Sequence, residues 1–214
     1  FTDAVKDFYG YYKKNEVHEF RIDNYVTSGY GLNFCAIREE NKNNEYLKKR
    51  VNSFQEKIRN ENQERFHEAV TSYFNFVDQK IWTEEGHDGS GYIAWAIESS
   101  NKQKEEFLDI IEQMQNTISR NSTEDIKDLI SKYTEIKDKI DALIGDGQIG
   151  GSKFTITLAD IKKTEFLWQS YKNSMIEFVK NQFGVEASRN ISKWIYQKRI
   201  ENLMNIVELY YDYN

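Results

Sequence analysis

The chain of 214 residues contains no proline and only one cysteine, Cys35. An interior proline costs a helix about 3 kcal/mol, so its absence favours long uninterrupted helices. One cysteine cannot form an internal disulfide and excludes a cysteine-rich zinc site. No C-x-x-C or H-E-x-x-H arrangement is present, so the sequence predicts no metal and no cofactor, and Cys35 is interpreted as a small buried residue.

The chain also lacks a long apolar run and an excess of positive charge. Without about 18 consecutive apolar residues, no transmembrane helix is expected. The 35 acidic and 29 basic side chains give a net charge of −6, which argues against nucleic acid as a partner. The 4 Trp, 14 Tyr and 13 Phe residues argue for a folded core.

Motifs for nucleophilic catalysis, phosphate binding and dinucleotide binding are absent as well. Paired carboxylates such as Glu105-Glu106 are typical of solvated faces in a chain with this many acids. The sequence therefore predicts a non-enzymatic protein, and a cryptic carboxylate or histidine site is the alternative.

Hydrophobic spacing is helical along almost the whole chain. The clearest apolar stripe runs over 126–144 and ends at Gly145, a natural stop. Helices are expected at 3–26, 32–59, from a capping box at 60–63 onward, 92–120, 126–144, from a start signal at 157–160 onward, and 186–211. The glycine-rich stretch 145–151 is predicted to be a flexible connector, and the one β-like fragment, 154–158, is too short to anchor a sheet. These patterns predict an all-α fold, an elongated antiparallel bundle of about seven helices.

A shift of about 95 residues aligns two parts of the chain. It places Tyr73 on Trp168 and Lys104 on Arg199, and a shift of about 89 places Leu47 on Ile136. The alignment predicts two three-helix units, 32–120 and 121–214, after an N-terminal helix within 1–31. Chance alignment of helical stripes is the alternative, and the units could pack as one domain.

The polar segment 82–91 is predicted to be a loop between two long helices. Loops on a rigid scaffold often carry recognition. If this loop does so, Glu84, Glu85 and Asp88 would bind a cationic partner, and His87 would add sensitivity to pH. An ordinary interhelical turn is the alternative.

Several short motifs resemble a known family. Trp168 is followed three residues later by Tyr171 and then by Lys172, and Arg199 is followed four residues later by Leu203. Residues of the first unit match an earlier pattern of the same family at Cys35, Asn44, Leu47, Lys48 and Val51. The chain thus resembles the LprI-type lysozyme inhibitors, small helical domains of the bacterial envelope with W-x-x-Y-R and T-x-x-R-x-x-x-L patterns. For the matched residues we favour a structural role, in which a cation within an apolar stripe needs a carboxylate, a carbonyl or an aromatic partner.

The chain departs from the family pattern at several positions. Lys172 replaces an arginine, and Ile176 and Ile191 stand where the family has cysteines. The resemblance implies a periplasmic or secreted protein that binds and inhibits lysozyme, and a removed leader would account for the start at Phe1. An immunity-type protein that neutralises a toxin and a helical structural adaptor are the competing hypotheses.

Overall fold

The computed structural model describes residue 6 and residues 28–85, 89–114, 125–145, 148–150 and 155–213. The elements in these ranges are the helices α2 (Gly29–Gln55), η2 (Asn60–Asn62), α3 (Gln63–Thr83), α4 (Tyr92–Met114), α5 (Ile126–Ile144), α6 (Leu158–Phe183) and α7 (Val185–Tyr213), and the strands β1 (Gln148–Gly150) and β2 (Thr155–Thr157). The predicted all-α class is confirmed. Six α-helices are described where about seven were expected, because the first expected helix, 3–26, lies almost wholly outside the described residues.

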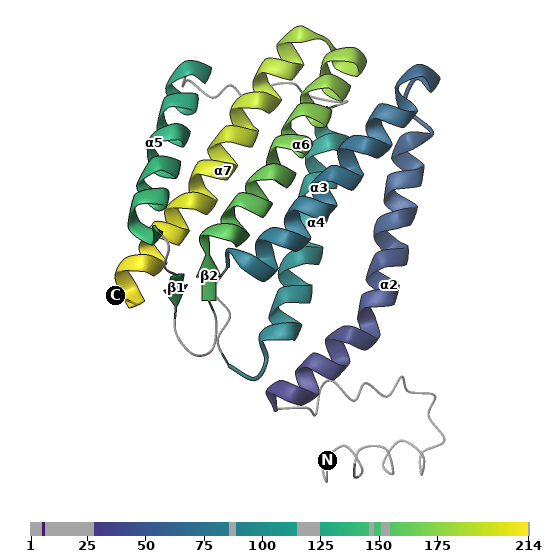
Figure 1. Cartoon of the computed structure of the whole chain (residues 1–214). Helices are drawn as coiled ribbons and strands as arrows, with labels where there is room; N and C mark the ends of the chain where they lie inside the picture. The colour runs from purple at the N-terminus through teal and green to yellow at the C-terminus, as the bar shows by residue number, and fades with distance from the viewer. Residues whose placement is uncertain are drawn as a thin grey trace.

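An antiparallel pair of helices, α3 and α6, joins the two halves of the chain (Figure 1). Near one end of this pair the Phe66 and Phe178 rings lie 5.3 Å apart, and near the other end the Thr83 and Thr164 hydroxyls lie 3.0 Å apart. Helix α4 packs on α3, and α7 packs on α6. The outer helices α2 and α5 then pack on α4 and α7, so the two halves have the same order of contacts.

The helix boundaries confirm some local predictions and correct others. The start signal predicted at 157–160 is confirmed, since Thr157 caps α6 through a complete capping box with Asp160. Gly145, with a φ of 51°, ends α5. Helix α2 ends at Gln55, four residues before the predicted end. The capping box predicted at 60–63 is wrong because Asn60 begins the short helix η2, while α3 begins at Gln63 and its N-cap residue, Asn62, makes no capping bond.

A short β-hairpin follows α5. Ile149 in β1 lies opposite Ile156 in β2, and both side chains are buried. Part of the segment predicted to be a flexible connector is therefore an antiparallel strand, because a buried apolar pair fixes its register. The β-like fragment was correctly located, and with only three residues it leaves the fold class unchanged.

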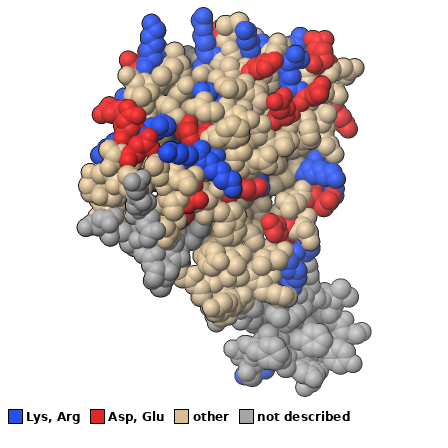
Figure 2. Space-filling view, viewed as in Figure 1, with Lys and Arg blue, Asp and Glu red and all other residues tan. Residues whose placement is uncertain are grey.

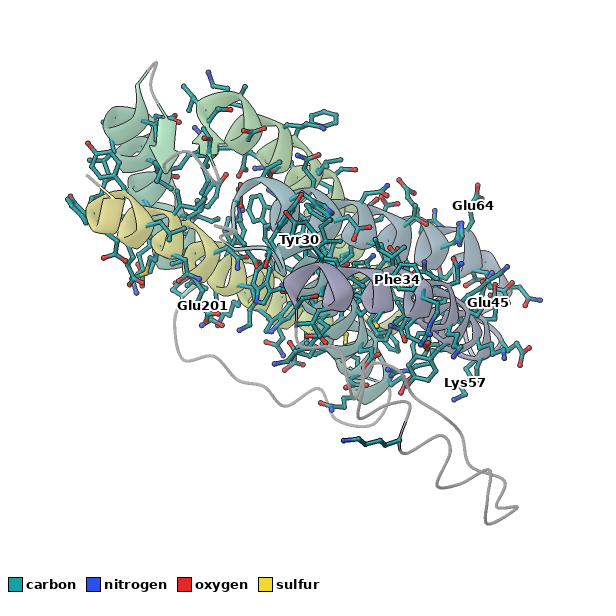
Figure 3. The ribbon with its side chains drawn as sticks, turned by 90° about the horizontal axis from the view of Figure 1, so that it is seen from below. Tyr30, Phe34, Glu45, Lys57, Glu64 and Glu201 are labelled. Atoms are coloured by element: carbon teal, nitrogen blue, oxygen red, sulfur yellow. The ribbon has the colours of Figure 1, made fainter. Side chains whose placement is uncertain are left out.

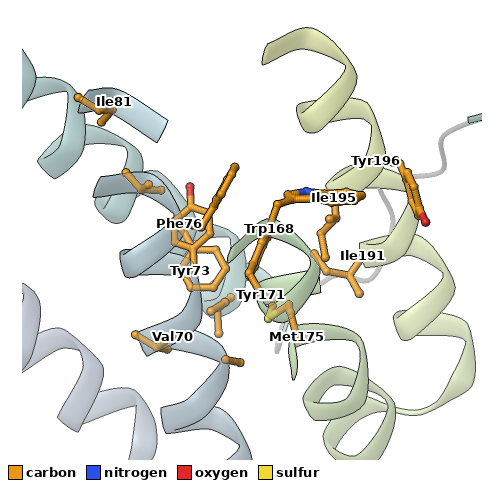
Figure 4. Close-up of a cluster of buried hydrophobic side chains, with 14 of the residues drawn as sticks. Val70, Tyr73, Phe76, Ile81, Trp168, Tyr171, Met175, Ile191, Ile195 and Tyr196 are labelled. Atoms are coloured by element: carbon orange, nitrogen blue, oxygen red, sulfur yellow. The ribbon is translucent and has the colours of Figure 1, made fainter. Parts of the chain in front are cut away.

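One hydrophobic core runs through both halves of the described chain. Trp168, Tyr171 and Met175 of α6 lie between side chains of α3 and side chains of α7 such as Ile195 (Figure 4). Two pairs aligned by the shift of 95, Tyr73 with Trp168 and Lys104 with Arg199, are buried in both halves. The two units share a core, while their origin by duplication stays a prediction.

The described surface is mixed in character. Acidic and basic side chains are interspersed over the upper part of the face in Figure 2. Tyr30 and Phe34 are exposed on α2 (Figure 3). None of the described helices has an apolar stretch long enough to cross a membrane.

Candidate functional site: an acidic groove between α4 and α7

A buried ion-pair cluster lies where α3, α6 and α7 meet. The Arg199 guanidinium donates to both oxygens of Glu84, at 2.5 and 2.8 Å, and to Glu165 Oε2 at 3.3 Å. It also lies 5.7 Å from the centre of the Phe76 ring. Arg199 thus has both the carboxylate and the aromatic partners that a cation in an apolar stripe needs.

The cluster changes the interpretation of Glu84. This residue was predicted to bind a partner, but it is 3% exposed and its carboxylate is held by Arg199. We therefore correct its role to that of an internal ion pair. Burial by itself would lower the pKa of Arg199, but the charge and hydrogen bonds of Glu84, together with the charge of Glu165, raise it above its ordinary value.

Glu85 lies beside the cluster and links α3 to α4. Its carboxylate accepts hydrogen bonds from Lys80 Nζ at 2.5 Å, Gln103 Nε2 at 3.3 Å and Ser99 Oγ at 3.5 Å. His87 and Asp88, the other two predicted contact residues, lie outside the described residues. The predicted loop is therefore tied to the bundle at its first residues.

The residues that match the family pattern on α6 form an aromatic and polar cluster. The Trp168 ring stacks on the Tyr133 ring at 4.9 Å and meets the Tyr196 ring edge-on at 5.3 Å. Lys172 Nζ donates to Gln169 Oε1 at 2.5 Å and lies 5.0 Å from the centre of the Trp168 ring. Leu203, Leu47 and Cys35 are buried. These positions fit the structural role favoured for them.

Glu165 connects this cluster to Arg199. It accepts a hydrogen bond from the Tyr133 hydroxyl and one from Gln169 Nε2 at 2.9 Å. Burial, and then the hydrogen bond and charge of Glu165, raise the pKa of Tyr133 well above its ordinary value. The hydroxyl therefore stays protonated and keeps its role as a donor to the carboxylate.

A groove of about 760 Å³ opens between α4 and α7, and its floor is formed by α3 and α6. Seven carboxylates and three cations line it, so negative charge is in excess. The carboxylates are Glu84, Glu85, Glu106, Asp109, Glu201, Glu208 and Asp212. Each lining cation already has a lining carboxylate partner: Lys80 pairs with Glu85, Lys198 with Glu201, and Arg199 with Glu84. Two of the other carboxylates pair with cations outside the lining, Asp109 with Arg50 at 2.7 Å and Glu106 with Lys102 at 4.0 Å. The lining itself is therefore acidic, while part of its negative charge is balanced by cations outside it.

The groove floor is aromatic and contains one hydroxyl without a partner. Tyr73, Phe76, Trp168 and Tyr171 line the floor. The Tyr73 hydroxyl donates to the Gln103 carbonyl oxygen at 3.2 Å. Within the described part of the chain, the Tyr171 hydroxyl is the one buried side-chain polar atom without a hydrogen-bond partner.

Sequence analysis did not find the groove residues Glu106 and Glu201, nor the core acid Glu165. The shift of 95 residues that places Lys104 on Arg199 also places Glu106 on Glu201, and that match was the available signal. Glu165 offered no such signal, since its partners Tyr133 and Arg199 are brought to it only by the fold. In the described ranges, no group of three or more His, Cys, Asp or Glu side chains is placed to hold a metal ion.

The fold and the groove define the class of the protein, an all-α helical bundle with an acidic, aromatic-floored groove between two helices. No family model, curated protein or solved structure matches the chain.

Proposed function

We propose that this is a non-enzymatic binding protein of the bacterial envelope, periplasmic or secreted, that inhibits a basic lysozyme by direct contact. The groove between α4 and α7 would make that contact. The observation that carries the proposal is the excess of lining carboxylates over an aromatic floor. The resemblance of the Trp168 and Arg199 motifs to LprI-type inhibitors supports the choice of lysozyme.

Charge supports the proposal both during the approach of the partner and at contact. A net charge of −6 attracts a strongly basic protein such as a typical lysozyme from afar. At contact, exposed carboxylates on both groove walls, such as Glu106 on α4 and Glu201 on α7, would pair with the partner's cations. Aromatic side chains beneath them supply the apolar area that anchors a protein interface.

The direct test mixes the purified protein with several basic lysozymes and follows lysis of bacterial cell walls and co-elution on a sizing column. We expect a complex at micromolar concentration and slower lysis. If no complex forms and lysis is not slowed at that concentration, the proposal is rejected. A complex that forms without slowing lysis would reject the proposed inhibition and retain only the proposed binding.

Matched variants locate the contact. Glu106→Lys with Glu201→Lys reverses one carboxylate on each groove wall and should weaken binding at least about tenfold through like-charge repulsion. The control is Glu45→Lys with Glu64→Lys, two exposed acids on α2 and α3 that do not line the groove (Figure 3). Both double variants change the net charge equally. Equal weakening by the two would show that overall charge, and not the groove, governs binding.

A further inference from the structure

The Tyr171 side chain is placed in a way that the folded chain alone does not explain. It is 2% exposed, it lines the groove floor, and its hydroxyl has no partner among the described residues. A buried hydroxyl without a hydrogen bond destabilises the folded state relative to a satisfied one. The neighbouring rings are those of Tyr73 at 4.8 Å and Phe76 at 5.9 Å, and neither residue forms a hydrogen bond with the Tyr171 hydroxyl.

The same floor already holds one guanidinium. Arg199 sits between the carboxylates of Glu84 and Glu165 with the Phe76 ring 5.7 Å away. Arginine suits such a place better than lysine because its planar group stacks on rings and is more weakly hydrated. The groove lining offers the same two kinds of group, exposed carboxylates such as Glu106 and Glu208 and the aromatic side chains of the floor.

We propose that the groove binds an arginine side chain of the protein partner between α4 and α7, and that the Tyr171 hydroxyl oxygen accepts a hydrogen bond from its guanidinium. The proposal rests on the proposed function in taking a basic protein as the source of the arginine. The groove volume of about 760 Å³ lies in the range of pockets that enclose a small ligand, so it accommodates the arginine with its neighbouring residues.

A set of three capped short peptides tests the choice of arginine. Their sequences are identical except for a central arginine, lysine or citrulline, the last being the neutral isostere of arginine. Affinity is measured by calorimetry and by tryptophan fluorescence, since Trp95, Trp168 and Trp194 line the groove. We expect the arginine peptide to bind about tenfold more tightly than the lysine peptide, and the citrulline peptide to show no binding. Equal affinity for any two of the three, or no binding of the arginine peptide, would overturn the proposal.

A matched pair of variants tests the role of Tyr171. Tyr171→Phe removes a hydroxyl that has no partner in the free protein, so the melting temperature should stay the same or rise. The affinity for the arginine peptide should fall about tenfold. The control is Tyr196→Phe, a buried tyrosine outside the groove lining whose hydroxyl accepts from Lys172 Nζ at 3.4 Å. That change should lower the melting temperature slightly and leave the affinity unchanged. A lower melting temperature for Tyr171→Phe, or unchanged affinity, would overturn the assignment.

Failure of this inference and failure of the proposed function give different results. If lysozyme is inhibited but the arginine peptide does not bind, the function stands and the arginine assignment fails. If the arginine peptide binds and Tyr171→Phe weakens it while no lysozyme is bound or inhibited, the assignment stands and the lysozyme proposal fails.

Discussion

At the scale of single residues, Arg199 is a fully buried cation that links helices through two ion pairs. Its side chain has no exposed surface, and it joins α7 to Glu84, the residue that follows α3, and to Glu165 on α6. A buried pair adds little net stability over an apolar replacement, but removing one partner leaves an uncompensated charge. The equivalent cation Lys104 pairs with Asp78 at 2.7 Å, where the carboxylate is about half exposed. Arg199 is therefore the more sensitive of the two aligned cations.

Replacing Arg199 with methionine tests this sensitivity. Arg199→Met leaves the buried Glu84 carboxylate without its cation, so the free energy of unfolding should fall by about 3–5 kcal/mol. Adding Glu84→Gln removes the stranded charge and should restore much of the loss. Both are measured by urea unfolding. The control is Arg65→Met, which breaks the exposed pair with Glu177 and should cost less than about 1 kcal/mol. A loss for Arg65→Met as large as that for Arg199→Met would contradict this account.

At the scale of elements, the sequence predicted those helix ends that depend on local chemistry. The Thr157 capping box and the stop at Gly145 are made by residues close together in the chain, and the structure contains both. The end of α2 and the capping box at the start of α3 were predicted wrongly, and at the start of α3 a distant contact replaces the cap. The box was predicted to begin at Asn60, but the residue before α3 is Asn62, whose amide makes no capping bond and donates to Gln182 Oε1 on α6 at 3.0 Å. No local pattern reports such a contact.

The candidate site could also be predicted from the sequence only in part. Trp168 and Arg199 could be singled out from short motifs, and the need of Arg199 for a carboxylate or aromatic partner followed from its apolar surroundings. Which carboxylates would meet it could not be predicted, since Glu84 and Glu165 come from other helices. Groove acids look like any solvated helix acid in the sequence. These acids are brought together only by the fold, which places α4 and α7 on the two sides of the groove.

The cap of α6 provides a test at the element scale. The Thr157 hydroxyl accepts from the Asp160 backbone N–H at 3.1 Å, so Thr157→Ala should lower the free energy of unfolding by about 1 kcal/mol. The control is Thr134→Ala, in the exposed middle of α5, where the hydroxyl only donates to the Ile130 carbonyl at 2.9 Å. That change should be neutral or slightly stabilising because alanine has the higher helix propensity. Thermal and urea unfolding would reveal both effects, and equal losses would argue against the cap.

At the scale of the whole molecule, aromatic contacts run across the boundary between the two predicted units. Tyr73 and Tyr171 meet at 4.8 Å, and Phe66 and Phe178 at 5.3 Å, in each case joining α3 to α6. Ring pairs of this kind add about 0.5–1.5 kcal/mol each beyond the area they bury. The two halves are therefore expected to unfold together in one transition.

Alkaline titration tests this shared core through its buried phenols. Burial raises the pKa of Tyr73 and Tyr171 well above the ordinary 10.0, and burial together with Glu165 does the same for Tyr133. Below about pH 10 these phenols are protonated in both the folded and unfolded states, so their contribution to stability is complete. Above about pH 10 the phenols of the unfolded chain lose their protons while those of the folded chain keep them, so stability falls as the pH rises.

We expect the buried phenols to ionise only as the helices are lost, so that part of the phenolate absorbance rises together with the loss of far-ultraviolet circular dichroism. Tyr73→Phe should reduce that coincident step, because it removes one phenol from the core. Tyr30→Phe, which alters a tyrosine that is 80% exposed, should leave the step unchanged. Complete ionisation of the tyrosines with the helical signal intact would show that these phenols reach solvent without unfolding. Separate helical transitions for the two halves would show that the contacts between α3 and α6 do not couple them.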